Sequence, residues 1–375
     1  MPDKIVELLK KGLKEQVYPG AVLLAARGED IVFFHNVGSR ALIPKPLPME
    51  RETIFDLASL TKPLGTALAI MKLIDEGLVG LDIPISSLIK PFPWKDKANL
   101  TVRLLLSHSA GLPDWKPFYL ELTKYPMEER KPALRRLIME EPLDEGPKKV
   151  SLYSDLGFML LEWIIETVTD QDLSSFLNSS LYHPLGLNEL YLDQITADTV
   201  DEKRSFAATE YCKWRKETMQ GHVHDENAYA LGGYSGHAGL FGTAPDIFTL
   251  IKRLIKIYHG YCSEPITTET VRTFFSRQEI VPDSTWALGW DTPAEKNSSS
   301  GNYFSSSSVG HTGFTGTSVW IDLRENITVI FLTNRIHPSR SNEKIKDFRP
   351  KLHNLIMREF LRGQGIHRAR SSLKY

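Results

Sequence analysis

The sequence predicts an α+β fold, in which one antiparallel sheet is flanked by N- and C-terminal helices and the middle of the chain forms a mostly helical lobe. β-rich runs occur near the two ends of the chain, and helical patterns joined by Pro- and Gly-marked loops fill the middle. The simplest packing brings both strand regions into one sheet. With 375 residues, the chain is long enough for one large domain or two.

The N-terminal end predicts a helix followed by a β-hairpin. Within residues 1–20, Ile5 and three leucines recur on one face, which is typical of an amphipathic helix. The next stretch, GAVLLAARGEDIVFFHNVG, contains two β-rich runs around a turn at 27–30. We therefore expect a hairpin over about 20–38.

The C-terminal end predicts a second pair of strands and a terminal helix. The stretch TSVWIDLRENITVIFLTNR alternates well and turns at 324–326, and a helical pattern covers about 342–361. Before this strand pair, the serine-rich stretch at 295–310 predicts a flexible loop.

These elements divide the chain into two predicted lobes. Residues 1–55 and 265–375 would form an α/β lobe that contains the sheet and the terminal helices, and residues 56–264 would form the mostly helical lobe. We expect an active site in a cleft between the lobes, because binding sites are frequently found in such positions.

Composition excludes several classes of protein. The formal charge of -1 and the pI of about 6.8 provide no basic surface for nucleic acid. No run of the sequence reaches the roughly 18 apolar residues of a membrane span. Cys212 and Cys262 occur in no metal-ligand spacing, so we expect free thiols, with a single disulfide as the open alternative.

The N-terminus indicates a cytoplasmic protein, because it lacks the apolar core of a secretory signal. A chain trimmed of its leader would look the same, so an extracytoplasmic location stays open. The sequence gives no indication of the oligomeric state.

A serine and a lysine stand at the start of a predicted helix. In FDLASLTKPLGTALAIMKLIDEG, Pro63 lacks a backbone N–H and fits only in a first turn, which places Ser59 at the N-terminal end. Lys62 follows one turn later on the same face, where the helix dipole disfavours a cation. A neutral or proton-sharing Lys62 could accept the Ser59 proton, and the Ser59 N–H could hold an oxyanion. The alternative is a capping serine beside a lysine that extends to solvent.

The Ser-x-x-Lys spacing alone is not specific. Only the pair at Ser59 begins an apolar helix. Three other pairs have the same spacing: Ser87 and Lys90, Ser341 and Lys344, and Ser371 and Lys374.

Two further motifs carry side chains suited to catalysis. Tyr153 and Asp155 open another apolar helix, where a capped helix start is the structural alternative. His311, Thr312 and Gly313 open a strand, and the glycine would let a substrate approach the backbone. Each motif alone is compatible with a purely structural role.

Together, the three motifs in this order resemble the serine β-lactamase and penicillin-binding-protein superfamily. The stretch LLLSHSAGLPDW at 104–115 also resembles a segment usual in this family. The stretch HDENAYALGGYSGHAGLFGTAPD at 224–246 resembles a segment of its class C β-lactamase-like, esterase and D-Ala-D-Ala carboxypeptidase branch. The resemblance covers roughly residues 15–362. It implies a β-lactamase/transpeptidase-like fold in which the three motifs meet in one cleft.

The resemblance implies a role for each matching residue. Ser59 would be the nucleophile that forms an acyl-enzyme, with Lys62 as its proton partner. Tyr153 would be a general base or proton relay, and the N–H groups of Ser59 and Phe314 would form the oxyanion hole. His311 replaces the more common lysine and would supply positive potential or a hydrogen bond near the substrate carboxylate or the tyrosine.

Asp155 departs from the family pattern, which has asparagine at this position. Its carboxylate would add negative charge near Lys62, raise the pKa of Lys62 and weaken an amide-type contact with the substrate. This departure argues against penicillin-like specificity more than against hydrolase chemistry. With Thr312 and Gly313, Asp155 would support the site or bind the substrate.

Two rival kinds of site fit less well. The stretch 233–237 fails the Gly-x-Ser-x-Gly pattern of α/β-hydrolases at His237, which we expect to be structural, although it could line the cleft. In HVHDEN, Glu226 and Asn227 stand where a binuclear metallo-hydrolase pattern has aspartate and histidine. We therefore favour a loop-ordering network over a metal site.

We expect a serine hydrolase that acts through an acyl-enzyme, without a cofactor or metal, on an ester or amide of a small molecule or peptide. One alternative is a D-Ala-D-Ala carboxypeptidase or related penicillin-binding protein. Such an enzyme would act on cell-wall peptides outside the cytoplasm, which the missing export signal argues against. The other alternative is a slowly deacylating penicillin receptor, or a scaffold, without turnover.

Overall fold

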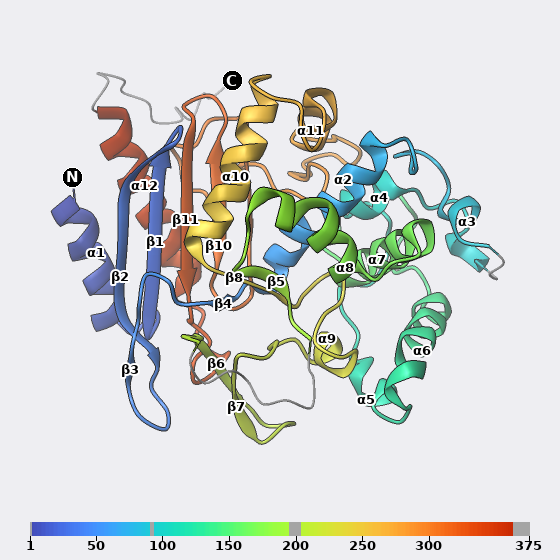
Figure 1. Ribbon diagram of the computed structural model, residues 1–375, viewed down its shortest axis with the longest axis horizontal. Helices are drawn as coiled ribbons and strands as arrows, with labels where there is room; N and C mark the ends of the chain where they lie inside the picture. The colour runs from blue at the N-terminus through green and yellow to red at the C-terminus, as the bar shows by residue number, and fades with distance from the viewer. Residues whose placement is uncertain (1, 91–93, 195–203, 363–375) are drawn as a thin grey trace.

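The computed structural model describes residues 2–90, 94–194 and 204–362. Its largest element is a six-stranded sheet that joins strands from both ends of the chain (Figure 1). The strand order is β3-β2-β1-β11-β10-β9. The bounds are β1 Gly20–Arg27, β2 Asp30–Ala41, β3 Leu47–Pro48, β9 Ser308–Thr312, β10 Ser318–Asp322 and β11 Ile327–Thr333.

The prediction of one antiparallel sheet from the two chain ends is confirmed. β1 lies antiparallel to both of its neighbours, with Leu24 opposite Phe34 of β2 and Ile330 of β11. The two hairpins turn where the sequence predicts, at Gly28 with φ of +58° and at Asn326 with φ of +53°. Glycine and asparagine tolerate the left-handed backbone that these tight turns require.

Helices cover both faces of the sheet. α1 (Pro2–Lys14) and α12 (Ile345–Arg362) lie together on one face, and α10 (Ala244–Tyr258) lies on the other (Figure 1). The middle of the chain contributes further helices and two small sheets, β4-β8-β5 and β6-β7. Their bounds are α2 Ala67–Asp75, α3 Ile85–Leu88, α4 Val102–Leu106, α5 Tyr119–Leu122, α6 Met127–Glu140, α7 Asp155–Thr169, α8 Leu173–Leu177, α9 Glu226–Ala230, α11 Thr268–Phe274, β4 Phe55–Asp56, β5 Leu190–Leu192, β6 Ala208–Cys212, β7 Glu217–Gln220 and β8 Leu240–Gly242.

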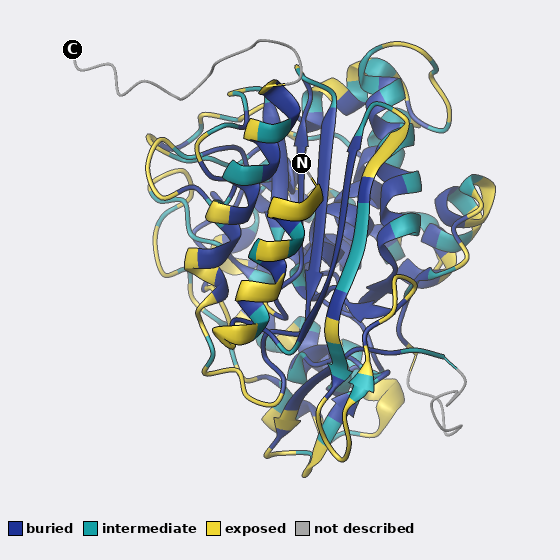
Figure 2. Cartoon of the chain, turned by 90° about the vertical axis from the view of Figure 1, so that its left-hand side faces the viewer, coloured by how far each residue is buried: buried dark blue, intermediate teal, exposed yellow. Residues whose placement is uncertain are grey.

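Apolar cores lie on opposite faces of the sheet because successive strand residues point to opposite sides. Leu23, Val329 and Phe331 belong to the core beneath α1 and α12. Figure 2, which looks onto this side, shows exposed outer faces of the helices over buried strands. On the other face, Leu24 and Ile330 join the larger core, which continues into the helices of the middle of the chain. Since that core is continuous, the division into two lobes stays a prediction.

Three further expectations concern segments outside the sheet. The serine-rich stretch before β9 is anchored, since Ser300 and Phe304 are buried and Ser305 donates hydrogen bonds from its N–H and its hydroxyl to Asp322. The expected flexible loop is thus held by tertiary contacts that composition does not reveal. Both cysteines are free thiols. Among the residues described, no helix combines the length and apolarity needed to cross a membrane.

The close packing of the end of β2 against the residue before β1 can be tested at Gly38. This residue has φ of +76°, and a Cβ added to it would lie 2.2 Å from the carbonyl oxygen of Pro19. Gly38→Ala should therefore lower the free energy of unfolding by about 1–2 kcal/mol for the backbone conformation and a further 1–3 kcal/mol for the clash. Urea denaturation measures the sum of the two contributions as the loss in the free energy of unfolding. Gly77→Ala is the matched control, because Gly77 has φ of +73° and no atom within 4 Å of such a Cβ. Equal losses in the two variants would show that the clash is not felt.

Candidate active site

Ser59 lies in an irregular stretch between β4 and α2. Residues 58–60 form a 3₁₀ turn and residues 62–66 a π-helical turn, so the regular helix begins only at Ala67. The expectation of one continuous α-helix is therefore wrong for its first turns. Pro63 lies within the π-helical turn, where its missing N–H removes a hydrogen bond that a regular helix would need.

A buried carboxylate holds the backbone directly before the serine. Ala58 has φ of +49°, and its N–H donates to Asp56 Oδ1 at 2.9 Å. Asp56 is 3% exposed, and burial raises its pKa to about 6 although it also accepts the His224 N–H. Ser59 itself is only half-buried. Sequence analysis missed Asp56, although a carboxylate three residues before the serine was visible in FDLAS.

Lys62 is fully buried and its ammonium has three polar neighbours. Nζ lies 3.3 Å from Ser59 Oγ, 2.7 Å from Asp155 Oδ1 and 3.2 Å from the carbonyl oxygen of His237. It also lies 4.7 Å from the centre of the Tyr153 ring. The structure thus brings the expected serine, lysine, tyrosine and aspartate together at one point.

The charge state of this cluster follows from its contacts. Burial would lower the pKa of Lys62, but the Asp155 carboxylate and the Tyr153 phenol outweigh it, and the net pKa is raised. Burial raises the pKa of Tyr153, and the cation of Lys62 opposes that rise only in part. At neutral pH the lysine is therefore an ammonium and the tyrosine a neutral phenol. The neutral Lys62 that we considered from sequence is not the resting state.

The turn between β9 and β10 is fastened to the backbone beside Ser59. Thr315 Oγ1 donates to the carbonyl oxygen of Asp56 at 2.8 Å, and Thr317 Oγ1 donates to that of Leu57 at 3.0 Å. At Gly313 an added Cβ would lie 2.5 Å from the Leu57 carbonyl oxygen and 3.5 Å from Ala58 Cβ, so only glycine permits this approach. The Gly313–Phe314 backbone consequently lies next to the serine.

His311 is buried at the end of β9 and is neutral. Burial and the nearby Lys62 lower its pKa to about 3. Of the two roles expected for it, positive potential is therefore wrong at neutral pH, and only the hydrogen bond remains. The Nδ1–H donates to the Thr312 carbonyl oxygen at 2.9 Å, because a carbonyl can only accept. The bare Nε2 is a buried acceptor with no partner among the described residues.

Phe314 is 46% exposed beside the serine turn. Its ring stacks on His224 at 5.6 Å, and its carbonyl oxygen accepts a hydrogen bond from Arg335 Nε at 2.9 Å. The guanidinium of Arg335 lies 4.8 Å from the ring centre. These contacts hold the ring and the carbonyl oxygen of Phe314 in place.

His108 clamps the tyrosine segment, a role that sequence analysis missed. Its carbonyl oxygen accepts the Leu152 N–H and its Nδ1 accepts the Ser154 N–H, both at 3.0 Å, so the two bonds bracket Tyr153. The His108 ring lies 4.6 Å from the Tyr153 ring and 4.4 Å from that of Trp286. His108 lies in the LLLSHSAGLPDW stretch noted in the sequence, but its contact with residues 152–154 is tertiary, and no local sequence pattern predicts it.

Among the described residues, Asp155, Asp225 and His237 form the group that could in principle hold a metal ion, since each offers an atom within 4.8 Å of the others. Their charges already have partners. The Lys62 ammonium is 2.7 Å from Asp155, and His237 Nε2 is 3.0 Å from Asp225 Oδ1. Because a divalent cation would have to displace both, the donor set does not fit a metal.

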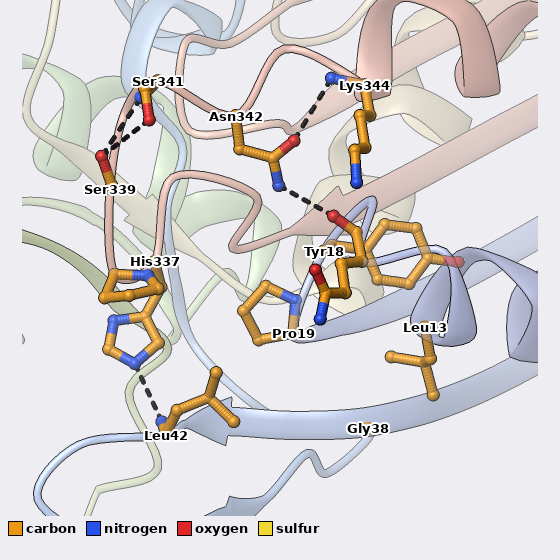
Figure 3. Close-up of a pocket in the computed structure, with 12 residues that line it drawn as sticks. Leu13, Tyr18, Pro19, Gly38, Leu42, His337, Ser339, Ser341, Asn342 and Lys344 are labelled. Atoms are coloured by element: carbon orange, nitrogen blue, oxygen red, sulfur yellow. Dashed lines mark hydrogen bonds between the residues drawn. The ribbon is translucent and has the colours of Figure 1, made fainter.

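A separate cavity of about 650 Å³ lies between α1, the start of β1 and the segment after β11 (Figure 3). Two of its polar side chains are already hydrogen-bonded: His337 Nε2 accepts the Leu42 N–H, and the Asn342 amide donates to the carbonyl oxygens of Gln16 and Val17. None of the predicted site residues lines it.

A family model described as Beta-lactamase matches residues 5–352. The chain belongs to the β-lactamase family. It is therefore a β-lactamase-family hydrolase, and the serine β-lactamase and penicillin-binding-protein resemblance seen in the sequence is confirmed.

The relatives include proteins named as a carboxypeptidase and as an amidase. The chain is 32% identical over 346 residues to a putative D-alanyl-D-alanine carboxypeptidase of Escherichia coli (strain K12), which covers 85% of this chain and 79% of that protein. It is 31% identical over 348 residues to an N-acetylmuramyl-L-alanine amidase of Bacillus subtilis (strain 168), with 85% and 78% covered.

Solved structures confirm the β-lactamase/transpeptidase-like fold. EstCE1, a hydrolase with promiscuous acyltransferase activity, is similar with a TM-score of 0.71 and 23% identity, over 93% of this chain and 98% of that one. The octameric penicillin-binding protein homologue from Pyrococcus abyssi is similar with a TM-score of 0.71 and 21% identity, over 97% of this chain and 77% of that one. At these identities the likeness concerns the fold alone.

The His108 clamp can be tested by unfolding. His108→Leu leaves the buried Ser154 N–H without an acceptor and should lower the free energy of unfolding by about 1–3 kcal/mol. His108→Asn should lose less, because Asn Oδ1 can replace Nδ1 as acceptor and asparagine tolerates the φ of +53° found at this position. Urea denaturation of both variants measures the difference. Equal losses would mean that the Nδ1 hydrogen bond does not matter.

Proposed function

We propose that this β-lactamase-family hydrolase cleaves an ester or amide of a small molecule or peptide through an acyl-enzyme on Ser59. The observation that carries the proposal is the 3.3 Å contact between Ser59 Oγ and the buried Lys62 Nζ, which also lies 4.7 Å from the centre of the Tyr153 ring. A half-buried hydroxyl beside a buried ammonium and a phenol is a nucleophile with a proton acceptor prepared next to it.

Tyr153 is the proposed proton acceptor. Tyr153 first loses its proton to bulk solvent, and the Lys62 ammonium, 4.7 Å from the ring centre, stabilises the phenolate that remains. Ser59 Oγ then attacks the carbonyl carbon while its proton moves to the phenolate. The phenol next protonates the leaving alcohol or amine, and the acyl group stays on Ser59. Water repeats the sequence to release the acid, with Tyr153 again taking and returning the proton.

The oxyanion would be held by the N–H groups of Ser59 and Phe314. The threonine bonds to the carbonyl oxygens of Asp56 and Leu57 support this assignment, because they hold the Gly313–Phe314 backbone against the serine turn. Donors that are fixed before the reaction stabilise the tetrahedral intermediate without reorganising.

A D-Ala-D-Ala carboxypeptidase or muramyl amidase is the second candidate, and the names of the relatives favour it. The charges of the site favour it less. A substrate carboxylate needs a cation, but His311 is neutral and Lys62 is paired with Asp155. Arg340 is bonded to two glutamates, and Arg335 donates to three main-chain carbonyl oxygens. These engaged cations are why we place a neutral ester or amide first.

One experiment separates turnover from slow acylation. Purified protein is incubated with a nitrophenyl acyl ester, and nitrophenol release is followed together with the mass of the intact chain. Continued release supports the hydrolase, whereas a single burst with a stable adduct on Ser59 supports a receptor. Parallel incubation with a fluorescent penicillin and a D-Ala-D-Ala peptide then compares the substrate classes.

Ser59→Ala should abolish turnover, because it removes the nucleophile. We expect the rate of nitrophenyl ester hydrolysis to fall by roughly four orders of magnitude or more and the acyl adduct to disappear from the mass spectrum. Ser87→Ala is the control, since Ser87 has the same Ser-x-x-Lys spacing but is exposed and bonded to the Pro84 carbonyl oxygen. Activity retained in Ser59→Ala rules out the proposed nucleophile.

The pH profile should rise on the alkaline side, because the raised pKa values of Lys62 and Tyr153 keep both groups protonated at neutral pH. Asp155→Asn removes the strongest contact that raises the pKa of Lys62, so the alkaline limb of kcat/KM should move to lower pH by about 1 unit or more. The macroscopic limb belongs to the coupled pair. No limb from His311 should occur above about pH 5, because its pKa is about 3. A limb that stays in place in Asp155→Asn would refute this account of Lys62.

A further inference from the structure

Two motifs outside the proposed reaction converge on Lys62. Asp225 comes from HVHDEN and His237 from GHAG, and His237 Nε2 donates to Asp225 Oδ1 at 3.0 Å. The His237 ring is 1% exposed, and its own carbonyl oxygen accepts a hydrogen bond from Lys62 Nζ at 3.2 Å. One residue thus touches Lys62 with its backbone and Asp225 with its side chain.

The backbone around His237 is held from several sides. The Ser235 hydroxyl and the Gly236 N–H both donate to the buried carboxylate of Glu162, at 2.7 and 2.8 Å. Thr66 Oγ1, from the π-helical turn that contains Lys62, donates to the Gly236 carbonyl oxygen at 2.6 Å. At Gly236 an added Cβ would lie 2.1 Å from the Phe158 carbonyl oxygen, so the turn lies hard against α7. The carbonyl that binds Lys62 is therefore fixed to the same elements as Lys62 itself.

Asp225 is fixed independently at the start of α9. Its Oδ1 caps this helix by accepting the Ala228 N–H at 2.8 Å, and the same oxygen accepts from His237. Burial would raise the pKa of Asp225, but the His237 ring outweighs it and holds the pKa well below its usual range. Burial would lower the pKa of His237, but Asp225 and then Asp155 outweigh it and the pKa is raised.

When His237 is protonated, these contacts give four buried or half-buried charges in alternating order: Lys62 positive, Asp155 negative, His237 positive and Asp225 negative. Asp155, His237 and Asp225 each present an atom within 4.8 Å of the other two. Without His237, the two carboxylates would leave the site with a net negative charge beside the nucleophile. Alternating charges at these distances stabilise one another strongly, because burial leaves little solvent to screen them.

We propose that His237 and Asp225 are positioning residues for the hydrolase reaction, which fix the carbonyl that binds Lys62 and balance the charge of Asp155. This inference rests on the proposed function for its effect on the rate of hydrolysis, but the pairing of His237 with Asp225 does not depend on the substrate. Asp155 then has two cationic partners, Lys62 and His237, so Lys62 does not neutralise the charge of Asp155 alone.

The ionisable groups around Lys62, His237 and Asp225 come from five segments of the protein. Asp155 and Tyr153 face Lys62 from the start of α7. His237 follows α9 and faces both Lys62 and Asp225, which precedes α9. The remaining neighbours are His108 after α4 and His311 of β9, whose pKa values are lowered by burial and then by Lys62, and His224, which faces Asp225.

His237→Gln tests the charge while keeping a donor, because Gln Nε2 can take the place of His Nε2 toward Asp225. The variant leaves one uncompensated negative charge near Lys62, so the alkaline limb of nitrophenyl ester hydrolysis should move to higher pH by about 1 unit or more. The double variant His237→Gln with Asp225→Asn restores the balance of charge, and its limb should return close to that of the wild type. A purely structural role predicts no such return.

Asp172→Asn is the matched control, because Asp172 caps α8 in the way that Asp225 caps α9. It should leave the limb in place. The inference is overturned if the alkaline limb does not move in His237→Gln. It is also overturned if the limb of the double variant lies at the same pH as that of His237→Gln. Should His237→Gln fail to fold, Asp225→Asn alone is measured: its limb must stay or move to lower pH, and a rise overturns the inference.

A readout without activity separates this inference from the proposed function. Protein labelled with ¹³C-lysine is titrated by NMR, with the Lys62 signal assigned by its loss in Lys62→Arg. The midpoint of Lys62 should rise in His237→Gln and return in the double variant. A wild type that does not hydrolyse esters contradicts the proposed function, whereas an unmoved Lys62 midpoint contradicts only the charge balance.

Discussion

The burial of the Lys62 ammonium is the constraint on which the site depends. A cation taken out of water needs partners on all sides, and removing one partner from a buried ion pair costs about 3–5 kcal/mol. Here the partners are the Asp155 carboxylate, the His237 carbonyl oxygen and the Ser59 hydroxyl. They come from three separate stretches of the chain, so satisfying one charge fixes the arrangement of the whole site.

The backbone irregularities around Ser59 serve the same arrangement. The π-helical turn at 62–66 and the positive φ of Ala58 both depart from a regular helix, and each is held by a buried group. Thr66 bonds to Gly236, and Asp56 bonds to Ala58. Strained backbone persists only where its surroundings over-determine it. The departures from regular structure are therefore concentrated where the chain must present a serine, a lysine and their partners together.

The sequence predicted what depends on local patterns. Alternation with Gly28 and Asn326 at the turns located both hairpins, and apolar periodicity located α1 and α12. It also placed Ser59 and Lys62 on one face. It did not predict the roles of Asp56, His108, Asp225 or His237, because these act through contacts between residues 12 to 175 positions apart, or through a backbone conformation that no periodicity reveals. The charge state of His311 was missed because a motif gives residue identity but not burial.

The balance of charge also bears on what the site can bind. If Lys62, Asp155, His237 and Asp225 sum to zero and His311 is neutral, the field at Ser59 is weak for a group carrying a full charge. Family members with lysine in place of His311 add a cation there, and those with asparagine in place of Asp155 remove an anion. Both features of this chain reduce positive potential relative to that pattern. The same two positions that make the motifs atypical therefore act in one direction, and they support the proposed ester or amide substrate in which no carboxylate lies near the scissile bond.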